Sequence, residues 1–325
     1  MRSVAFFNNK GGVGKTTLLC NVAACIALHF KKNVCIVDAD PQCNATQYFF
    51  DDEVIEELYY DDSSFTIFKV LEPLSLGEGY NQVLSVKQAY RFGVDVLPGD
   101  PRLALTEDLL ARDWGDAKGG DLRGIRTSLV FSQLLERLQN YDYVLFDVSP
   151  SLGALNRSIM LSSDFFISPV SLDIFSLKAF ENIAAWIESW WEEWERGLEN
   201  VRRKEIIPRL GYSKPQFIGY VTQSYLAKRD SQGQRRAVQA YESIRKKIDD
   251  VIIQNNLAPR NLDPKLFEIG TVPNLFSLVP MSQSNHTPIF GLTASDGVVG
   301  AHFSKVKESL EIFLSVSKEF LRRTS

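Results

Sequence analysis

Short apolar runs alternate with longer segments of helical periodicity in the first half of the chain. Residues 3–8, 34–37 and 143–146 are short and apolar, which is typical of strands buried in a sheet. Between the first two runs, residues 16–30 predict a helix whose apolar stripe consists of Leu18, Leu19, Val22, Ile26 and Phe30. The order strand, helix, strand predicts an α/β fold.

Later segments extend this pattern. Residues 93–110 predict a strand followed by a helix, and residues 214–226 predict another core strand that runs into a loop. Residues 301–323 predict an amphipathic helix with a stripe of Phe303, Val306, Leu310, Phe313, Val316 and Phe320. We interpret it as a final core helix, and the alternative is a membrane anchor.

Residues 180–204 predict one long helix that holds four of the five tryptophans. Its stripe recurs at three- and four-residue steps and consists of Phe180, Ile183, Ile187, Trp190, Trp194, Leu198 and Val201. Trp186 and Trp191 lie off that stripe. The favoured interpretation is a helix packed in the core or at a dimer edge. The alternative is a ridge that binds a partner, because tryptophan is enriched at interface hot spots.

The first predicted strand runs into NNKGGVGKTT, residues 8–17, which carries a phosphate-binding pattern. Gly14, Lys15 and Thr16 fill the end of G-x-x-x-x-G-K-[ST], while Asn9 stands at the first glycine position. Glycines let backbone N–H groups reach phosphate oxygens, the lysine supplies positive charge, and the hydroxyl binds Mg²⁺. The expected nucleotide contacts are Lys10, Gly11, Gly12, Val13, Gly14, Lys15, Thr16 and Thr17.

Aspartates follow the other two apolar runs. Asp38 and Asp40 come after the second run, and Asp147 after the third. Ligands gather at the carboxyl ends of parallel strands, so we expect these side chains beside the phosphate loop. Carboxylates there hold the water ligands of Mg²⁺ or orient an attacking water. The alternatives are that Asp38 or Asp40 caps the turn at Pro41, and that Asp147 only ends its strand.

The second lysine of the loop, Lys10, gives the chain its clearest resemblance to a known family. KGGVGKTT resembles the deviant Walker A loop of the ParA/MinD family of P-loop ATPases. The segments DADPQ at residues 38–42 and DVSPSLG at residues 147–153 are similar to two further family motifs, with Ser149 in place of a usual proline. The resemblance implies the P-loop NTPase fold, a mostly parallel twisted sheet flanked by helices, with helical insertions.

The resemblance also implies an activity, hydrolysis of ATP to ADP and phosphate with Mg²⁺. In this family the extra lysine reaches across a face-to-face homodimer to the phosphates held by the other subunit. Lys10, Lys15 and Asp40 are thereby implied in catalysis, with Asp40 positioning the attacking water.

Metal and base contacts follow from the same resemblance. Thr16, Asp38 and Asp147 are implied to support Mg²⁺. Residues 274–280 resemble a family segment whose proline lies beside the adenine, so Pro280 and Met281 are the expected base contacts.

Composition is that of an ordinary globular protein, with 325 residues of which 45% are hydrophobic and 23% charged. The family motifs run along the whole chain, so we expect one domain over residues 1–325. Its surplus length is expected in insertions at about 50–90, 111–128 and 185–213. Within these, residues 50–64 and 111–124 are polar and predict exposed loops or short helices.

A cytoplasmic location is expected. Residues 2–15 contain no signal-peptide core, and no apolar run approaches the roughly 20 residues of a membrane span. The four cysteines all lie before residue 45 without metal-binding spacing, which predicts buried free thiols and argues against an iron–sulfur cluster.

A local basic segment contrasts with the net charge of −4. DNA-binding members of the family carry a basic residue where this chain has Lys228 and Arg229, and Arg235 and Arg236 follow. These four residues are the expected contacts to the phosphates of non-specific DNA. The alternative is an ordinary solvated helix face.

The favoured hypothesis is a ParA-like ATPase that partitions DNA or positions cargo on nucleoid DNA, with a ParB-like or other partner that stimulates hydrolysis. One alternative is a MinD-like ATPase at a membrane surface, against which the short tail counts. Another is an ATP-gated switch that binds a protein through the tryptophan-rich helix. A metabolic enzyme on the same fold is disfavoured by Lys10.

Overall fold

The computed structural model describes residues 1–61, 64–209, 211–225, 228–229, 235–236, 239–258, 263 and 267–325. Its main sheet has eight strands in the order β10-β7-β6-β1-β5-β2-β4-β3. The strands are β1 (Arg2–Phe6), β2 (Val34–Ala39), β3 (Lys87–Ala89), β4 (Val94–Leu97), β5 (Tyr143–Val148), β6 (Phe165–Val170), β7 (Gln216–Tyr225) and β10 (Glu268–Pro273). All neighbours are parallel except β3 and β4, which confirms the predicted mostly parallel α/β sheet.

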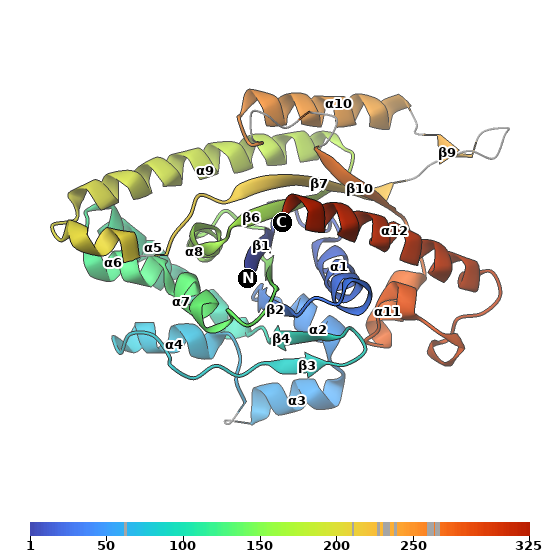
Figure 1. The fold of residues 1–325 in the computed structure, drawn as a ribbon, viewed down its shortest axis with the longest axis horizontal. Coiled ribbons are helices and arrows are strands. Elements are labelled where there is room, and N and C mark those ends of the chain that lie inside the picture. Colours follow the sequence, from blue (N-terminus) through green and yellow to red (C-terminus); the bar gives the residue numbers. More distant parts are fainter. Residues whose placement is uncertain are drawn as a thin grey trace.

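Helices cover both faces of this sheet (Figure 1). One face carries α1 (Lys15–Phe30), α2 (Asn44–Phe49), α11 (Leu278–Ser284) and α12 (His302–Arg323). The other carries α4 (Phe68–Leu76), α5 (Glu107–Lys118), α6 (Leu122–Ser128), α7 (Val130–Arg137), α8 (Ala154–Ser162) and α9 (Ile174–Asn200), with α10 (Gln239–Gln254) on α9. Helix α3 (Asp52–Tyr60) lies beyond the β3 edge. Short 3₁₀ helices are η1 (Pro101–Thr106), η2 (Lys204–Arg209), η4 (Ile289–Gly291) and η5 (Ala294–Asp296).

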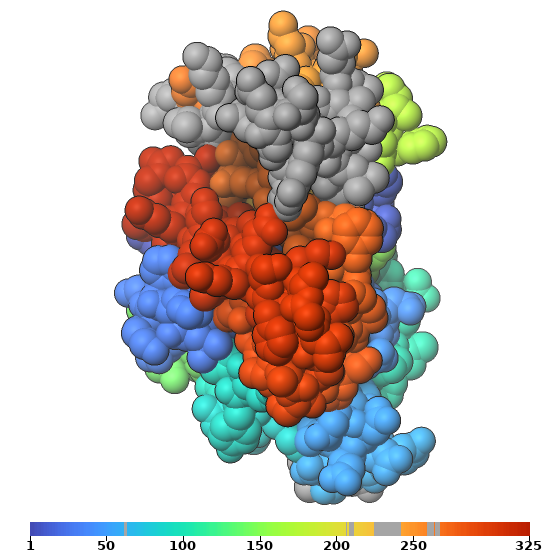
Figure 2. Space-filling view, turned by 90° about the vertical axis from the view of Figure 1, so that its right-hand side faces the viewer, coloured from blue at the N-terminus to red at the C-terminus, as the bar shows by residue number. Residues whose placement is uncertain are grey.

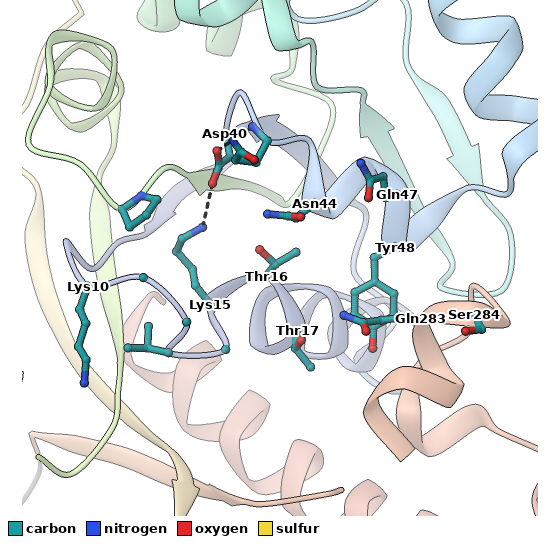
Figure 3. A pocket seen from close by; sticks show the side chains of 16 residues that line it. Lys10, Lys15, Thr16, Thr17, Asp40, Asn44, Gln47, Tyr48, Gln283 and Ser284 are labelled. Atoms are coloured by element: carbon teal, nitrogen blue, oxygen red, sulfur yellow. Dashed lines mark hydrogen bonds and ion pairs between the residues drawn. The ribbon is translucent and has the colours of Figure 1, made fainter. Parts of the chain in front are cut away.

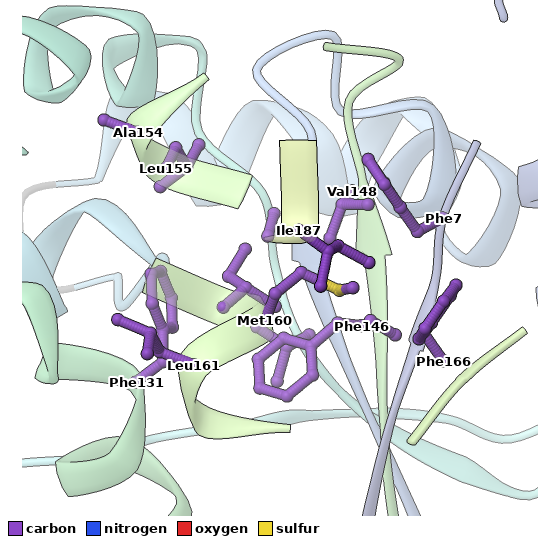
Figure 4. Packing of buried hydrophobic residues seen from close by; sticks show 14 of the residues in the cluster. Phe7, Phe131, Phe146, Val148, Ala154, Leu155, Met160, Leu161, Phe166 and Ile187 are labelled. Atoms are coloured by element: carbon purple, nitrogen blue, oxygen red, sulfur yellow. The ribbon is translucent and has the colours of Figure 1, made fainter. Parts of the chain in front are cut away.

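The central strands are apolar throughout because both of their faces are buried. Along β1, Val4 and Phe6 pack under α1 and α12, while Ala5 packs under α8 and α9. This alternation follows from the two-residue repeat of a strand. On the second face, Phe146 of β5 packs with Met160 of α8 (Figure 4). The continuous apolar runs of the sequence are therefore explained by a sheet sandwiched between two helical layers.

Two of the predicted helices differ from their expected surroundings or bounds. Helix α9 begins at Ile174, earlier than expected, because the Asp173 side chain caps it by accepting from the Ser176 amide. Residues 111–124 lie in α5 and α6 and in the turn between them, and most of them are exposed, as expected for a polar segment. One face of α5 is buried, which was not expected. Trp114 is 5% exposed and stacks on Trp194 of α9 with ring centres 5.8 Å apart.

Helix α12 is a core helix, as expected. Its stripe residues Val306, Phe313, Val316 and Phe320 are buried. Phe303, the first of the stripe, is exposed. The segments coloured orange-red, toward the C-terminal end of the sequence, lie on the face of the molecule that Figure 2 shows. Among the described residues, no helix is both long and apolar enough to cross a bilayer. All four cysteines are buried and free, as predicted.

Candidate nucleotide-binding site

The glycine loop connects β1 to α1 and has the backbone that phosphate binding requires. Gly12 and Gly14 have positive φ angles of 72° and 76°, and Gly14 stands at the N-cap of α1. L-residues with a Cβ rarely adopt this conformation, so glycine is required there. The predicted order of strand, loop and helix is confirmed.

Lys15 lies at the centre of a buried group of carboxylates. Its side chain is 8% exposed, and its Nζ lies 2.6 Å from Asp147 Oδ1 and 3.9 Å from Asp40 Oδ2 (Figure 3). The Thr16 hydroxyl donates to Asp147 Oδ2 at 2.7 Å. The structure thus brings together four of the residues that the sequence predicted to act on phosphate and metal.

Asp38 pairs with Asp147 across neighbouring strands but has different contacts. Its Oδ2 accepts hydrogen bonds from the Thr46 amide at 2.8 Å and the Thr46 hydroxyl at 2.6 Å. Burial, together with the nearby Asp147 carboxylate, raises the pKa of Asp38 to about 7. These contacts hold the start of α2 against the sheet. Any effect of Asp38 on a metal would therefore be transmitted through its neighbours.

Asp40 lines the main cavity, whose volume is about 610 Å³. Its Oδ1 accepts from the Gln42 amide at 3.0 Å, and burial raises its pKa above the usual value. The cavity is lined by the whole phosphate loop from Lys10 to Thr17, by residues of α2 and by Gln283 and Ser284 at the end of α11. A carboxylate that faces such a cavity can accept a hydrogen bond from a bound water.

Lys10 has a different orientation from Lys15, because its side chain points away from the centre of the cavity (Figure 3). Its Nζ forms an ion pair with Asp173 and lies 3.5 Å from the Ser171 hydroxyl. The exposed ring of Phe175 is centred 5.9 Å from the same Nζ. Asp173 was not singled out from the sequence; the available signal was an aspartate directly before an amphipathic helix.

A second, smaller cavity of about 130 Å³ lies on the other side of the loop. It shares Gly12, Gly14 and Thr17 with the main cavity. Its walls are mostly apolar and include Leu18, Val272, Pro273, Leu275, Val279, Ile289 and Phe313. Two amide side chains, Gln223 and Asn274, complete the lining. We call this cavity the slot.

Pro280 and Met281, the expected base contacts, are not among the residues that line either cavity. They belong to α11, whereas the proline that ends β10 and lines the slot is Pro273. The sequence holds two similar tripeptides, TVP at residues 271–273 and LVP at residues 278–280, and the resemblance to the family segment rests on the second. The pairing of β10 with β7 identifies the first as the end of the strand.

The four basic residues expected at DNA form one small element. Strands β8 (Lys228–Arg229) and β9 (Arg235–Arg236) pair antiparallel, with Lys228 opposite Arg236 and Arg229 opposite Arg235. We call this element the basic ribbon. The side chains of these four residues lie outside the described part of the structure.

The tryptophan-rich helix is packed in the core. Trp190 and Trp194 are 2% and 1% exposed. Ile187 of the same helix belongs to the buried cluster that also holds Val148 and Phe7 (Figure 4). The favoured interpretation of a core helix is confirmed for this stripe.

Glu107, at the start of α5, was also missed from sequence. Its carboxylate accepts from the backbone amides of Ala154 and Leu155, the latter at 3.0 Å. It thus caps α8, the helix that follows the segment DVSPSLG. Only the folded structure brings these residues together.

Comparisons with known proteins agree with this geometry. A family model described as an AAA domain matches residues 1–199. The sporulation initiation inhibitor protein Soj of Bacillus subtilis is 30% identical over 182 residues, which cover 55% of this chain and 62% of Soj. A solved protein from Corynebacterium diphtheriae is 30% identical, with a TM-score of 0.75 and coverage of 99% of this chain and 98% of that one.

A putative plasmid partition protein from Borrelia burgdorferi, solved with AMPPNP bound, has the same fold. Its TM-score is 0.61 at 16% identity, and the alignment covers 99% of each chain. The family model spans more than half of this chain, and the loop carries the second lysine. The chain therefore belongs to the ParA/MinD family of deviant Walker A P-loop ATPases.

Proposed function

We propose that this protein is an ATP-dependent switch ATPase that dimerises when it binds ATP and acts in DNA partition or cargo positioning. The observation that carries the proposal is the pair of lysines in one phosphate loop. Lys15 is buried among carboxylates that suit a metal and phosphates, whereas Lys10 points away from the centre of the same cavity. The Lys10 ammonium in this position could contact phosphates bound by a second copy of the chain.

The residues beside Lys15 fit a magnesium nucleotide. Among the described residues, no group of three or more side chains of the His, Cys, Asp and Glu types forms a metal cage. Mg²⁺ needs none, because it is commonly bound by one or two protein oxygens together with phosphates and water. The Thr16 hydroxyl and the Asp147 carboxylate, 2.7 Å apart, are the groups that would hold it. Bound there, the ion would neutralise charge on the phosphates.

Hydrolysis transfers the γ-phosphoryl group of ATP to water. Asp40 faces the cavity and would orient that water, while Lys15 would bind the phosphate oxygens. The Lys15 ammonium is held by Asp147, so phosphate oxygens would compete with that carboxylate. The Lys10 ammonium of each copy would add a positive charge beside the phosphates that the other copy binds.

The slot is the proposed site of the base. It adjoins the phosphate loop at Gly14 and Thr17, and its apolar walls suit an aromatic ring. Pro273 at the end of β10 and Phe313 of α12 are part of those walls. This assignment replaces Pro280 and Met281 as the proposed base contacts.

DNA is proposed as the surface on which the dimer acts. The basic ribbon places four cationic residues on one antiparallel pair, in a protein whose net charge is −4. Contacts to phosphates alone are enough for binding without sequence preference. A dimer that presents two ribbons would be retained on nucleoid DNA until a ParB-like partner stimulates hydrolysis. The Borrelia plasmid partition protein of the same fold supports a role of this kind.

One domain over residues 1–325 remains our proposal for the organisation, with insertions at about 50–90, 111–128 and 185–213. Two alternative functions are less well supported by the structure. Most of the apolar stripe of α12 is buried, which leaves little of it for a membrane surface. The stripe of α9 is buried as well, which disfavours it as a partner-binding ridge.

The test combines self-association with DNA binding. Light scattering coupled to size exclusion should show that ATP converts an Asp40→Ala variant, which is expected to hydrolyse ATP very slowly, from monomer to dimer. That dimer should bind non-specific duplex DNA with an affinity that falls as salt rises. Lys228→Glu/Arg229→Glu should abolish DNA binding without affecting the dimer.

A matched control changes the same charge elsewhere. Arg202→Glu/Arg203→Glu changes the charge by the same amount at a different basic pair, whose side chains are exposed, and should retain DNA binding. A dimer that ignores DNA would contradict the nucleoid role, and an ATP-bound protein that stays monomeric would contradict the dimerising switch.

A further inference from the structure

We propose that Glu107 of α5 is a positioning residue for hydrolysis, because it fixes the segment that connects β5 to α8 against the phosphate loop. This segment consists of residues 149–153, and we call it the β5–α8 loop. The proposal rests on the proposed function, since it concerns the rate at which the protein hydrolyses ATP. Glu107 itself lies outside the nucleotide motifs, at the first position of α5.

The β5–α8 loop contacts the nucleotide site. It begins directly after β5, whose Asp147 carboxylate holds the Lys15 ammonium. Its Pro150 lines the main cavity, and the ring lies 3.9 Å from the point where a Cβ on Gly11 of the phosphate loop would stand. The position of this loop therefore shapes the cavity in which the attacking water would bind.

Glu107 fixes the far end of the loop. Its carboxylate accepts from the amides of Ala154 and Leu155, which begin α8 and have no acceptor within that helix. The residue before them, Gly153, has no side chain with which to cap the helix. A Cβ on Gly153 would overlap with Glu107 Oε1. The carboxylate thus occupies the space beside the N-cap and leaves one position for the end of the loop.

The shape of the loop has a separate, local cause. Asn156 of α8 is fully buried, and its Nδ2 donates to the carbonyl oxygens of Ser149 and Ser151, both at 2.8 Å. These bonds link the loop to its own helix and would move with that helix. Glu107 is different, because it links the start of α8 to another helix.

That other helix is firmly packed. Trp114 of α5 stacks on Trp194 of α9 with ring centres 5.8 Å apart, and its Nε1 donates to Glu193 at 2.8 Å. The guanidinium of Arg157, on α8, lies over the Trp114 ring at 4.4 Å. Helices α5 and α9 therefore form a support for α8, and Glu107 is the contact of this support that lies nearest to the loop.

Glu107→Ala should lower the rate of hydrolysis and leave nucleotide binding intact. Without the carboxylate, two amides lose their acceptor and the end of the loop can shift. A shift of about 1 Å in a group that shapes a reacting site can lower a rate by about a hundredfold, so we expect kcat to fall about 10- to 100-fold. The phosphate loop does not contact Glu107, so the Kd for ATP should change less than about threefold.

The experiment measures single-turnover phosphate release and ATP binding by calorimetry, both on the full chain with Mg²⁺. Asp108→Ala, which changes the exposed carboxylate next in the chain, is the matched control and should keep the wild-type kcat. Melting temperatures establish that each variant is folded. A residue with a purely structural role would lower the melting temperature and leave kcat of the folded protein unchanged.

A double-mutant cycle tests the contact itself. Gly153 has a φ of −83°, which alanine adopts without strain, so Gly153→Ala perturbs mainly the Glu107 carboxylate. In wild type it should lower kcat about tenfold or more. In the Glu107→Ala protein the same change should lower kcat less than about twofold, because the new Cβ no longer meets a carboxylate.

A folded Glu107→Ala protein with the wild-type kcat overturns the inference, and so does an equal effect of Gly153→Ala in both backgrounds. If Glu107→Ala does not fold, Glu107→Gln takes its place, because it keeps the size of the side chain and removes one of the two acceptors; a wild-type kcat in that variant has the same meaning. If wild type itself does not hydrolyse ATP, the proposed function fails as well.

Discussion

Lys15 and Lys10 belong to the same loop but lie in opposite environments. Lys15 is almost fully buried and is held by two carboxylates of the central strands, whereas the Lys10 side chain is 26% exposed and is held by Asp173 at the start of α9. Both cations thus have an acidic partner within the same chain. The comparison shows that a single loop can place one ammonium group, that of Lys15, inside its own binding site and a second, that of Lys10, near the surface.

The largest effect is expected from Lys15→Ala. It removes the buried cation that would bind the phosphates and leaves Asp147 as a buried charge without its ammonium partner. We expect ATP affinity to fall at least about a hundredfold, measured by calorimetry. Lys32→Ala, which changes a surface lysine, is the control and should bind normally. If Lys15→Ala still bound ATP tightly, Lys15 would not be the lysine that binds the phosphates within its own subunit.

Lys10→Ala should separate binding from assembly. Its ammonium points away from the centre of the cavity, so we expect the ATP affinity of the monomer to change less than about threefold. Dimerisation and hydrolysis should be lost, because the charge for the other subunit is gone. Light scattering and phosphate release measure the two effects. A Lys10→Ala protein that still dimerises with ATP would show that the second lysine has no role between subunits.

Asp173→Asn should release Lys10 and favour the dimer. Asparagine caps a helix as well as aspartate does, so the start of α9 is preserved while the ion pair is lost. Partly exposed ion pairs contribute about 1 kcal/mol or less, so the ATP concentration that gives half-maximal dimer should fall by up to about fivefold. An unchanged or higher concentration would mean that Asp173 does not restrain Lys10.

The smallest effect concerns Asp38 and the stability of the nucleotide-free protein. Burial raises its pKa to about 7, so the folded protein retains a proton that the unfolded chain has already released between about pH 4 and pH 7. The stabilisation that the Asp38 proton gives to the folded protein is present at low pH, and it is lost as the pH rises through the folded-state pKa of Asp38. Asp38→Asn keeps a carbonyl for Thr46 and removes the titration, so the melting temperature should fall less between about pH 6 and pH 8 than in wild type, by about 2–4 °C. The same fall in both proteins would contradict a raised pKa at Asp38.

Local motifs made the phosphate side of the site predictable. Lys15 and Thr16 are fixed by their place in the loop, and Asp147 joins them because parallel strands end at one edge of a sheet. The slot was not predictable in the same way. Gln223 and Pro273, which both line the slot, come together only through the pairing of β7 with β10, and no short motif marks either residue.

Surface exposure was hardest to predict where polar residues surround a large aromatic one. The glycines and charges around Trp114 favour a loop, but its ring stacks on Trp194 and its Nε1 donates to Glu193 at 2.8 Å. Residue periodicity identified the buried stripe of α9 correctly, yet it contained no information on which helix would cover that stripe. The helix that covers the stripe is identified only by contacts between segments that are distant in the sequence, such as Trp114 of α5 with Trp194 of α9.

The grouping of the tryptophans has an optical consequence. All five lie in one cluster, where Trp114 contacts Trp190 and Trp194, and Trp186 and Trp191 contact Trp190. Trp186 also packs against Phe7, just before the phosphate loop, with ring centres 5.5 Å apart. The intrinsic fluorescence of this protein therefore arises from a single place that touches the strand leading into the loop. Unlabelled protein carries its own reporter, and a stopped-flow trace of its emission would follow the loop as nucleotide arrives.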